Sequence, residues 1–125
     1  MGQWDIFKNY EGDNWYERNK EALKPKQDLI TWLLDSYGIL REGSAVLEVG
    51  ASNGYRLEYI RQRYGCRAVA VGPSKRAVEE GKNSYPHIEF YNISAEEMDF
   101  KEVFDLVIIN SVFHWIERAN LLEVY

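Results

Sequence analysis

The sequence has few of the features that secretion, membrane insertion or nucleic-acid binding would need. Cys66 is its single cysteine, so no intramolecular disulfide can form. No apolar run reaches the length of a signal-sequence core or a membrane span. Lys and Arg number 15 against 20 Asp and Glu, a net charge of −5, and no basic run stands out. We therefore expect a protein of the reducing cytoplasm, with no nucleic-acid or membrane partner.

The 125 residues are enough for one domain with a modest hydrophobic core, and the apolar content of 46% is typical of a globular protein. The first part of the chain is polar but rich in aromatic residues: Trp4, Phe7, Tyr10, Trp15 and Tyr16. We expect residues 1–25 to form an aromatic helical segment, either a lid over a bound cofactor or an extra layer at the edge of the core. Residues 26–125 would form the main domain.

Helical and strand-like patterns alternate along this main domain. Apolar residues at helical spacing predict a helix over 26–37 that ends at Gly38. Short apolar runs predict strands at 44–49, 67–71, 87–91 and 104–109. Helices are predicted over 53–64, ending at Gly65, after Ser74 as the N-cap, and over 115–125. Alternation with short connections predicts an α/β fold, a doubly wound parallel sheet with right-handed crossovers.

The stretch from Ala45 to Leu57 joins the first strand to its helix through two glycines. Gly50 would let the backbone turn sharply and approach a ligand, and Gly54 would let the next helix pack closely. Glu48 places a carboxylate at the end of the strand, where a pyrophosphate would be repelled but an amino group and a sulfonium would be attracted. The Gly-x-Gly-x-x-Gly pattern of dinucleotide-binding loops is absent.

This stretch resembles motif I of class I S-adenosylmethionine-dependent methyltransferases, in which an acid is followed by glycines at the second, fourth and sixth positions. Glu48, Gly50 and Gly54 match that pattern, and Ser52 stands where the middle glycine is commonest. The resemblance implies a Rossmann-like sheet of strand order 3-2-1-4. It also implies S-adenosyl-L-methionine as the cofactor, with Glu48, Gly50, Ala51, Ser52 and Gly54 around it.

The end of the second strand also resembles this family, with one departure. The family has an acid there that accepts hydrogen bonds from both ribose hydroxyls, whereas this chain has Gly72, followed by Pro73 and Ser74. Charge-assisted hydrogen bonds are worth roughly 1.5 to 3 kcal/mol each. The substitution therefore predicts weaker cofactor binding than is usual in the family, unless a nearby group such as Ser74 or Lys75 takes the place of the acid.

Two later segments extend the resemblance over most of residues 26–125. Ser94 and Ala95 stand where the family holds the adenine, Ser94 being able to accept one hydrogen bond from the adenine amino group. Asn110 follows the fourth strand and is expected near the cofactor. His114 is the candidate catalytic base, and its alternative role is to bind backbone groups or line the pocket. No metal site is expected.

The family's sheet has seven strands, and this sequence stops in the helix after the fourth. It resembles a first half, so strand 104–109 would be an open apolar edge. We expect that edge, or an exchange of the helix over 115–125, to pair two copies in a homodimer. A truncated chain, a naturally short protein and half of a split enzyme all agree with the sequence.

The function implied by the resemblance is S-adenosylmethionine-dependent methylation of a small-molecule acceptor, at oxygen or nitrogen, such as a sugar. The runs Trp15 to Asn19 and Ser52 to Glu58 are similar to methyltransferases encoded among bacterial surface-glycan biosynthesis genes. A second hypothesis is a non-catalytic cofactor-binding or interaction module, or a fragment of a larger methyltransferase, since Gly72 has lost the ribose acid. A dinucleotide-dependent oxidoreductase is a third, disfavoured by Glu48 and the glycine spacing.

Overall fold

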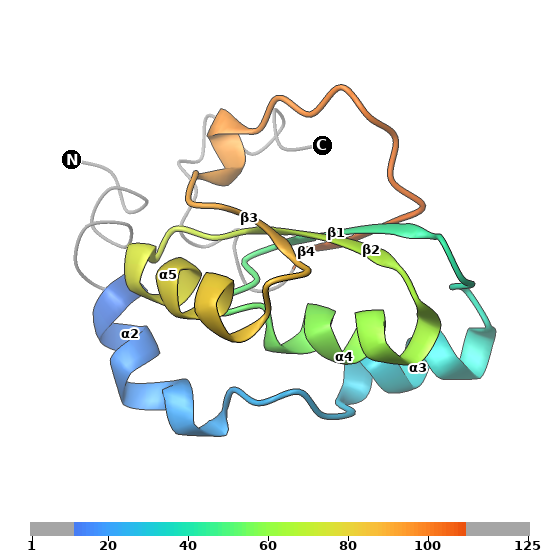
Figure 1. The fold of residues 1–125 in the computed structure, drawn as a ribbon, viewed down its shortest axis with the longest axis horizontal. Coiled ribbons are helices and arrows are strands. Elements are labelled where there is room, and N and C mark those ends of the chain that lie inside the picture. Colours follow the sequence, from blue (N-terminus) through green and yellow to red (C-terminus); the bar gives the residue numbers. More distant parts are fainter. Residues whose placement is uncertain (1–11, 110–125) are drawn as a thin grey trace.

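The computed structural model describes residues 12–109, which form one parallel sheet with helices (Figure 1). The strands are β1 (Ala45–Val49), β2 (Arg67–Val71), β3 (Glu89–Tyr91) and β4 (Leu106–Ile109). They lie in the order β3-β2-β1-β4, and every pairing is parallel. The predicted α/β fold and strand order are therefore confirmed for the described residues.

The helices and the long connection lie on opposite faces of this sheet. The α-helices are α2 (Gly12–Asn19), α3 (Leu29–Tyr37), α4 (Tyr55–Tyr64) and α5 (Lys75–Ser84), and the short 3-10 helices are η2 (Lys20–Ala22) and η3 (Ala95–Glu97). Figure 1 shows the α-helices below the sheet and the connection between β3 and β4, which carries η3, above it. Both faces of the sheet are thus covered.

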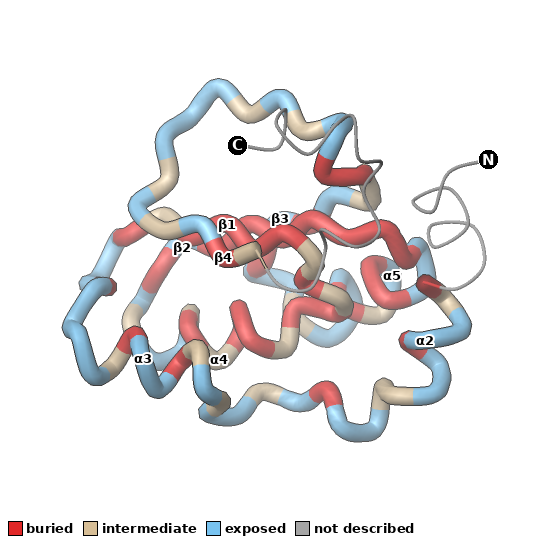
Figure 2. Tube along the Cα trace, turned by 180° about the vertical axis from the view of Figure 1, so that it is seen from behind, coloured by how far each residue is buried: buried red, intermediate tan, exposed pale blue. Residues whose placement is uncertain are grey.

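Successive side chains of β1 point to opposite faces of the sheet, so they belong to two separate core clusters. Val46 packs with α4 residues such as Leu57 and Ile60 on the helix-covered face. Leu47 and Val49 pack instead against the connection after β3, in a cluster that includes Ala95. Figure 2 shows the resulting buried band along the central strands. Because both faces are covered, β1 and β2 read as almost continuous apolar runs in the sequence.

The helix predicted over 26–37 begins later, at Leu29, because Asp28 caps it. The Asp28 carboxylate accepts a hydrogen bond from Thr31 N at 2.9 Å, and Asp28 N donates to Thr31 Oγ1 at 2.7 Å. This reciprocal pair fixes the first turn. The predicted end is confirmed, since Gly38 adopts a left-handed conformation with φ 59°.

Other predicted boundaries also move by one to three residues. The helix α4 begins at Tyr55 because Gly54, at φ 82°, has a non-helical backbone. The ladder of β4 begins at Leu106, because the side chain of Asp105 takes the Ala45 N–H through Oδ2 at 2.7 Å. β3 is shorter than predicted and begins at Glu89.

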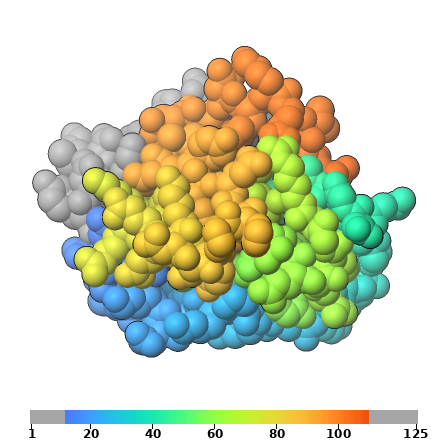
Figure 3. Space-filling model, viewed as in Figure 1, coloured from blue at the N-terminus to red at the C-terminus, as the bar shows by residue number. Residues whose placement is uncertain are grey.

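Within the segment 1–25, which was predicted to be helical, the structure has helix α2, and α2 packs on α5. Tyr16 is 2% exposed and donates its hydroxyl proton to Glu80, whereas Trp15 is 40% exposed. In Figure 3 the segment that contains α2 lies directly against α5. The aromatic residues Trp4, Phe7 and Tyr10, and the helix predicted over 115–125, lie outside the described residues.

Candidate functional site

The loops after β1 and β2 meet at the carboxyl end of the sheet. Between β1 and β4 the strand order reverses, which is where open α/β sheets bind ligands. Gly50 N and Ala51 N both donate to Val71 O, at 2.8 and 3.1 Å. A Cβ placed on Gly72 would lie 3.7 Å from Ser52 N. The structure therefore brings together the predicted residues that follow β1 and β2.

The loop after β1 turns through alternate residues with positive φ. Gly50 has φ 84°, Ser52 φ 56° and Gly54 φ 82°. Ser52 is the only non-glycine residue with positive φ in the described chain. The resemblance to motif I places it where glycine is commonest. Its conformation explains that preference, because left-handed backbone costs an L-residue about 1 to 2 kcal/mol.

Gly54 and Gly81 let α4 and α5 approach the ring of Phe90. A Cβ on Gly54 would lie 2.7 Å from Phe90 Cζ. A Cβ on Gly81 would lie 2.5 Å from Asn53 O and 2.6 Å from Phe90 Cζ. The expected packing role of Gly54 is therefore confirmed, and Gly81 serves the same purpose from the neighbouring helix.

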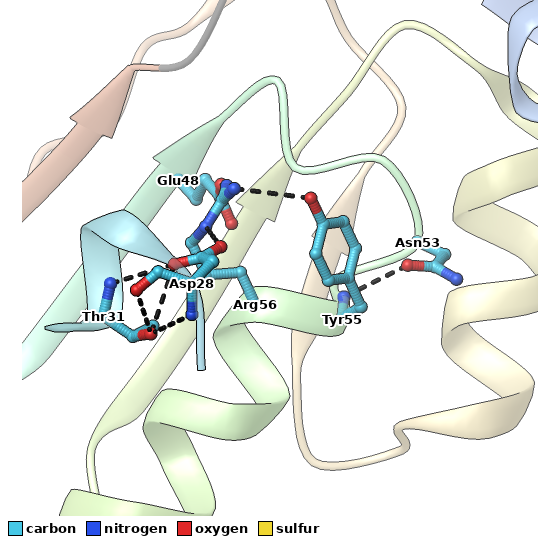
Figure 4. Close-up of polar contacts among 6 residues, drawn as sticks. All are labelled: Asp28, Thr31, Glu48, Asn53, Tyr55 and Arg56. Atoms are coloured by element: carbon cyan, nitrogen blue, oxygen red, sulfur yellow. Dashed lines mark hydrogen bonds and ion pairs between the residues drawn. The ribbon is translucent and has the colours of Figure 1, made fainter. Parts of the chain in front are cut away.

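Glu48 is fully buried on the helix-covered face, where Arg56 binds its Oε2 (Figure 4). Arg56 also donates through Nε to Asp28 Oδ2 at 2.7 Å. A third contact joins Arg56 Nη2 to the hydroxyl oxygen of Tyr55 at 3.3 Å. The carboxylate expected to face a ligand is thus part of a buried charge cluster that ties β1 to α4 and to the start of α3.

Burial raises the pKa of Glu48 to about 7, although Arg56 acts in the opposite direction. The pKa of Asp28 moves the other way: burial alone would raise it, but hydrogen bonds from Thr31 and Arg56 lower it below its usual value. Glu48 Oε1 is buried and has no hydrogen-bond partner among residues 12–109. One oxygen of this carboxylate therefore remains able to accept from a donor at the site.

Two residues after β2 matter for the site: Ser74, the predicted cap of α5, and Gly72, where the structure leaves room for a side chain. Ser74 Oγ accepts a hydrogen bond from Ala77 N at 3.1 Å, which confirms Ser74 as the N-cap of α5. A Cβ on Gly72 would meet only ordinary contacts with Ser52, so a side chain would fit there. Of the two groups considered as substitutes for the missing acid, Lys75 is highly exposed and Ser74 is buried.

Sequence reasoning missed Asp13, which lies at this same end of α5. Its Oδ1 accepts from Ser74 Oγ at 2.5 Å and from Arg76 N at 3.3 Å. Asp13 lies in the first turn of α2 and is separated from Ser74 by 61 positions in the chain, so no local sequence pattern indicated this contact. The N-terminal segment therefore contributes a carboxylate beside Ser74, at the start of α5.

The segment after β3 joins the other two loops. Asn92 Nδ2 donates to Gly72 O at 2.9 Å, a contact that the sequence did not indicate. Ser94 is buried and its N–H donates to Glu97 Oε1 at 2.9 Å, which fixes the turn into η3. Ala95 is buried against the sheet. The segment predicted to hold the adenine is thus attached to the end of β2.

The remaining predicted residues, Asn110 and His114, lie outside the described residues, so their roles stay predictions. Between residues 12 and 109, no three His, Cys, Asp or Glu side chains are arranged to hold a metal ion. Within the same range, no helix combines the length and apolar character that crossing a bilayer requires. Cys66 is a buried core residue, and burial raises the pKa of its thiol.

Comparison with known proteins agrees with this geometry. A family model described as a methyltransferase domain matches residues 46–125, which is more than half of the chain. The chain belongs to this methyltransferase-domain family. The resemblance inferred from the motifs around Glu48, Gly72 and Ser94 is therefore confirmed at the level of the family. No curated protein matched the sequence.

Solved structures share the fold of this methyltransferase domain. A plantazolicin methyltransferase, BpumL, in complex with SAH has 20% identity and a TM-score of 0.58; the match covers 64% of this chain and 32% of that one. Geranyl diphosphate C-methyltransferase from Streptomyces coelicolor A3(2), in complex with Mg2+, geranyl diphosphate and S-adenosyl-L-homocysteine, has 15% identity and a TM-score of 0.64, with coverages of 75% and 38%.

A third such structure is a SAM-dependent methyltransferase from Thiobacillus denitrificans in complex with S-adenosyl-L-homocysteine. Its identity is 18% and its TM-score 0.58, and the match covers 73% of this chain and 41% of that one. At these identities the likeness shows the fold. The match spans about a third to two-fifths of the length of these three proteins.

Proposed function

We propose that this methyltransferase domain binds S-adenosylmethionine where the loops after β1, β2 and β3 meet, and that it serves methyl transfer to a small-molecule acceptor. The observation that carries the proposal is the loop from Gly50 to Gly54, whose alternate positive φ angles fold it against the end of β2. Three solved structures of the same fold were determined with S-adenosylhomocysteine, the product of that cofactor.

The residues of the chain fit this cofactor in several ways. The loop at Gly50 has no side chain that would keep a ligand away from its backbone. Glu48 Oε1 has no hydrogen-bond donor among residues 12–109, so it can accept a hydrogen bond from the cofactor. Ser94 and Ala95 would lie beside the adenine, and Pro73 beside the ribose, as the family resemblance implies. When bound, S-adenosylmethionine supplies a methyl group that the positive charge of its sulfonium activates. The protein's main task is then to hold the acceptor in line at contact distance.

The acceptor and the catalytic base belong to the same proposal. A hydroxyl or amine acceptor, such as a sugar, would lose a proton, and His114 would take it. Asn110 would help to orient the methyl donor, since it directly follows β4. The lid role of residues 1–25 and a location in the cytoplasm are proposed with this function. We also propose a homodimer that pairs through β4, because Val107 on this edge strand is an apolar residue that is 46% exposed.

A non-catalytic cofactor-binding module, or a fragment of a larger methyltransferase, is the second candidate. It is favoured by the missing side chain at Gly72, at the end of β2. Turnover with candidate acceptors separates it from the first. Methyl transfer and a cofactor-binding module both require cofactor binding. An interaction module would bind no cofactor, and a dinucleotide oxidoreductase would bind NAD in its place.

Calorimetric titration with S-adenosylhomocysteine tests the shared requirement. Gly50→Ala should lose cofactor affinity, because a side chain would enter the loop where the backbone approaches the ligand. Gly43→Ala is the matched control: Gly43 has φ 83°, close to the 84° of Gly50, and no atom lies within 4 Å of its Cβ position. Both variants lose stability through backbone strain, by about 1 to 2 kcal/mol.

The two variants are therefore compared at a temperature where each is folded. The proposed site is supported if Gly43→Ala binds like the wild type while Gly50→Ala does not. Equal affinity in the two variants would place the cofactor elsewhere. Binding of NAD without binding of S-adenosylhomocysteine would replace the proposed function by an oxidoreductase.

A further inference from the structure

The helix α2 presents one side to α5 through residues spaced i, i+3 and i+4. Asp13, Tyr16 and Glu17 each contact α5 or its cap: Asp13 contacts Ser74, Tyr16 contacts Glu80, and Glu17 pairs with Arg76. Residues at this spacing lie on one side of a helix. The three contacts fix α2 along α5, so the position of Asp13 is determined by the packing of the two helices and not by Asp13 alone.

One carboxylate oxygen of Asp13 accepts hydrogen bonds, and the other has no donor among the described residues. Ser74 Oγ and Arg76 N both donate to Oδ1, at 2.5 and 3.3 Å. Among residues 12–109, no hydrogen-bond donor reaches Oδ2. A carboxylate can accept about four hydrogen bonds, so most of its capacity remains.

The end of β2 lacks the carboxylate that would accept hydrogen bonds from the ribose hydroxyls. In doubly wound sheets an acid about 20 residues after the first glycine of the loop binds the ribose hydroxyl. Gly72 occupies that position at the end of β2, and a Cβ there would contact only Ser52 backbone atoms, at 3.7 and 3.9 Å. The acid is therefore absent from β2, while Asp13 reaches the first residues of α5 from another part of the chain.

We propose that Asp13 supplies the carboxylate that receives the ribose hydroxyls of the cofactor, in place of the side chain missing at Gly72. The assignment rests on the cofactor binding proposed above. Ser74 and Arg76 N orient the carboxylate, and Oδ2 accepts from a ribose hydroxyl. The negative charge of Asp13 at the N-terminus of α5 also repels a phosphate, so a ribose carrying a 2′-phosphate is disfavoured.

The test measures how much the ribose hydroxyls contribute to binding. S-adenosylhomocysteine and its 2′,3′-dideoxy analogue are titrated by calorimetry into the wild-type chain, Asp13→Ala and Asp13→Asn. The wild type should prefer the hydroxylated ligand roughly 10- to 100-fold, as expected for charge-assisted hydrogen bonds. Asp13→Ala should bind both ligands almost equally, and Asp13→Asn should show an intermediate preference, because an amide oxygen still accepts but carries no charge.

Glu17→Gln is the matched control, since it weakens another α2–α5 contact and leaves Asp13 in place. It should keep the wild-type preference. The double variant Asp13→Ala/Gly72→Asp should regain a preference, because a carboxylate then reaches the ribose from β2. Thermal unfolding of each variant shows that it is folded during the titration.

The outcomes separate this assignment from the proposed function. If the wild type does not bind S-adenosylhomocysteine, both are overturned. If it binds with an unchanged hydroxyl preference in Asp13→Ala, the ribose assignment alone is overturned. The same conclusion follows if Glu17→Gln loses the preference as fully as Asp13→Ala, since the helix contact and not the Asp13 carboxylate would then be responsible.

Discussion

Arg56 donates through Nε to Asp28 Oδ2 at 2.7 Å, so the first turn of α4 is bonded to the residue that caps α3. The same guanidinium binds Glu48 within the sheet, which places a cation between two carboxylates, one partly exposed and one fully buried. Breaking a buried ion pair costs far more than breaking an exposed one, because the remaining charge stays buried. Removing the cation of this cluster should therefore cost more than removing the cation of an exposed pair.

The first prediction concerns the pH dependence of stability. The pKa of Glu48 is raised from 4.5 to about 7 on folding, so between these values the folded state holds a proton that the unfolded state has lost. The free energy of unfolding should therefore fall as pH rises from about 4.5 to 7, by a total on the order of 3 kcal/mol. Urea unfolding at a series of pH values measures this slope.

Glu48→Gln should flatten that slope, because the amide does not titrate. Glu58→Gln is the control: the pKa of Glu58 is lowered by a hydrogen bond from Arg61, so its contribution is lost only as pH falls below about 4.5. The control should keep the wild-type slope between pH 5 and 8. An unchanged slope in Glu48→Gln would show that Glu48 is ionised throughout this range.

The second prediction concerns the cation of the same cluster. Arg56→Met should destabilise the protein by about 3 to 5 kcal/mol at pH 8, because Glu48 would remain buried without an ion pair. The loss should be smaller at pH 5, where Glu48 can take up a proton. Denaturant unfolding at both pH values gives the difference.

Arg63→Met provides the comparison, since Arg63 pairs with Asp35 through a side chain that is 52% exposed. Exposed pairs are worth about 0 to 1 kcal/mol, so this variant should lose little at either pH. Equal losses in the two variants would contradict the assigned difference in burial.

The third prediction concerns the close approach of α5 to Phe90. Gly81→Ala should destabilise the protein, although alanine is favoured over glycine within a helix by about 1 kcal/mol. The added Cβ would lie 2.5 Å from Asn53 O, which is backbone and cannot move away cheaply. We expect a net loss of about 1 to 3 kcal/mol in the free energy of unfolding.

Phe90→Leu should not restore the stability of Gly81→Ala, because the Asn53 oxygen remains in the way. Gly72→Ala is the control, since a Cβ there has ordinary contacts only. It should leave the melting temperature almost unchanged. A stabilised Gly81→Ala would mean that α5 shifts without cost.

The fourth prediction concerns the edge of the sheet at β4. If two copies pair there, Val107→Lys should convert a dimer into a monomer, because a charge would enter the shared surface. Val103→Lys is the control, since Val103 is 92% exposed in the connection before β4. Light scattering at micromolar concentration should show a dimer for the wild type and the control alone. A monomeric wild type would refute the proposed dimer.

The sequence alone determined the elements and most of their ends. Gly38 and Gly65 end helices as predicted, and Ser74 caps α5, because these signals depend on the backbone conformation of one or two residues. The apolar runs determined β1 and β2, since a strand covered on both faces needs apolar residues at successive positions. The strand order and the cofactor followed from the family resemblance.

The side-chain partners were decided by the tertiary structure. Arg56 and Asp28 are separated by 28 positions, and Asp13 and Ser74 by 61, so no local pattern links them. Glu48 was expected near a ligand, which stays a prediction; the structure adds that Arg56 is the described cation that binds its Oε2 on the helix-covered face. A strand fixes which side chains share a face, but which charges meet there depends on how the helices pack across it.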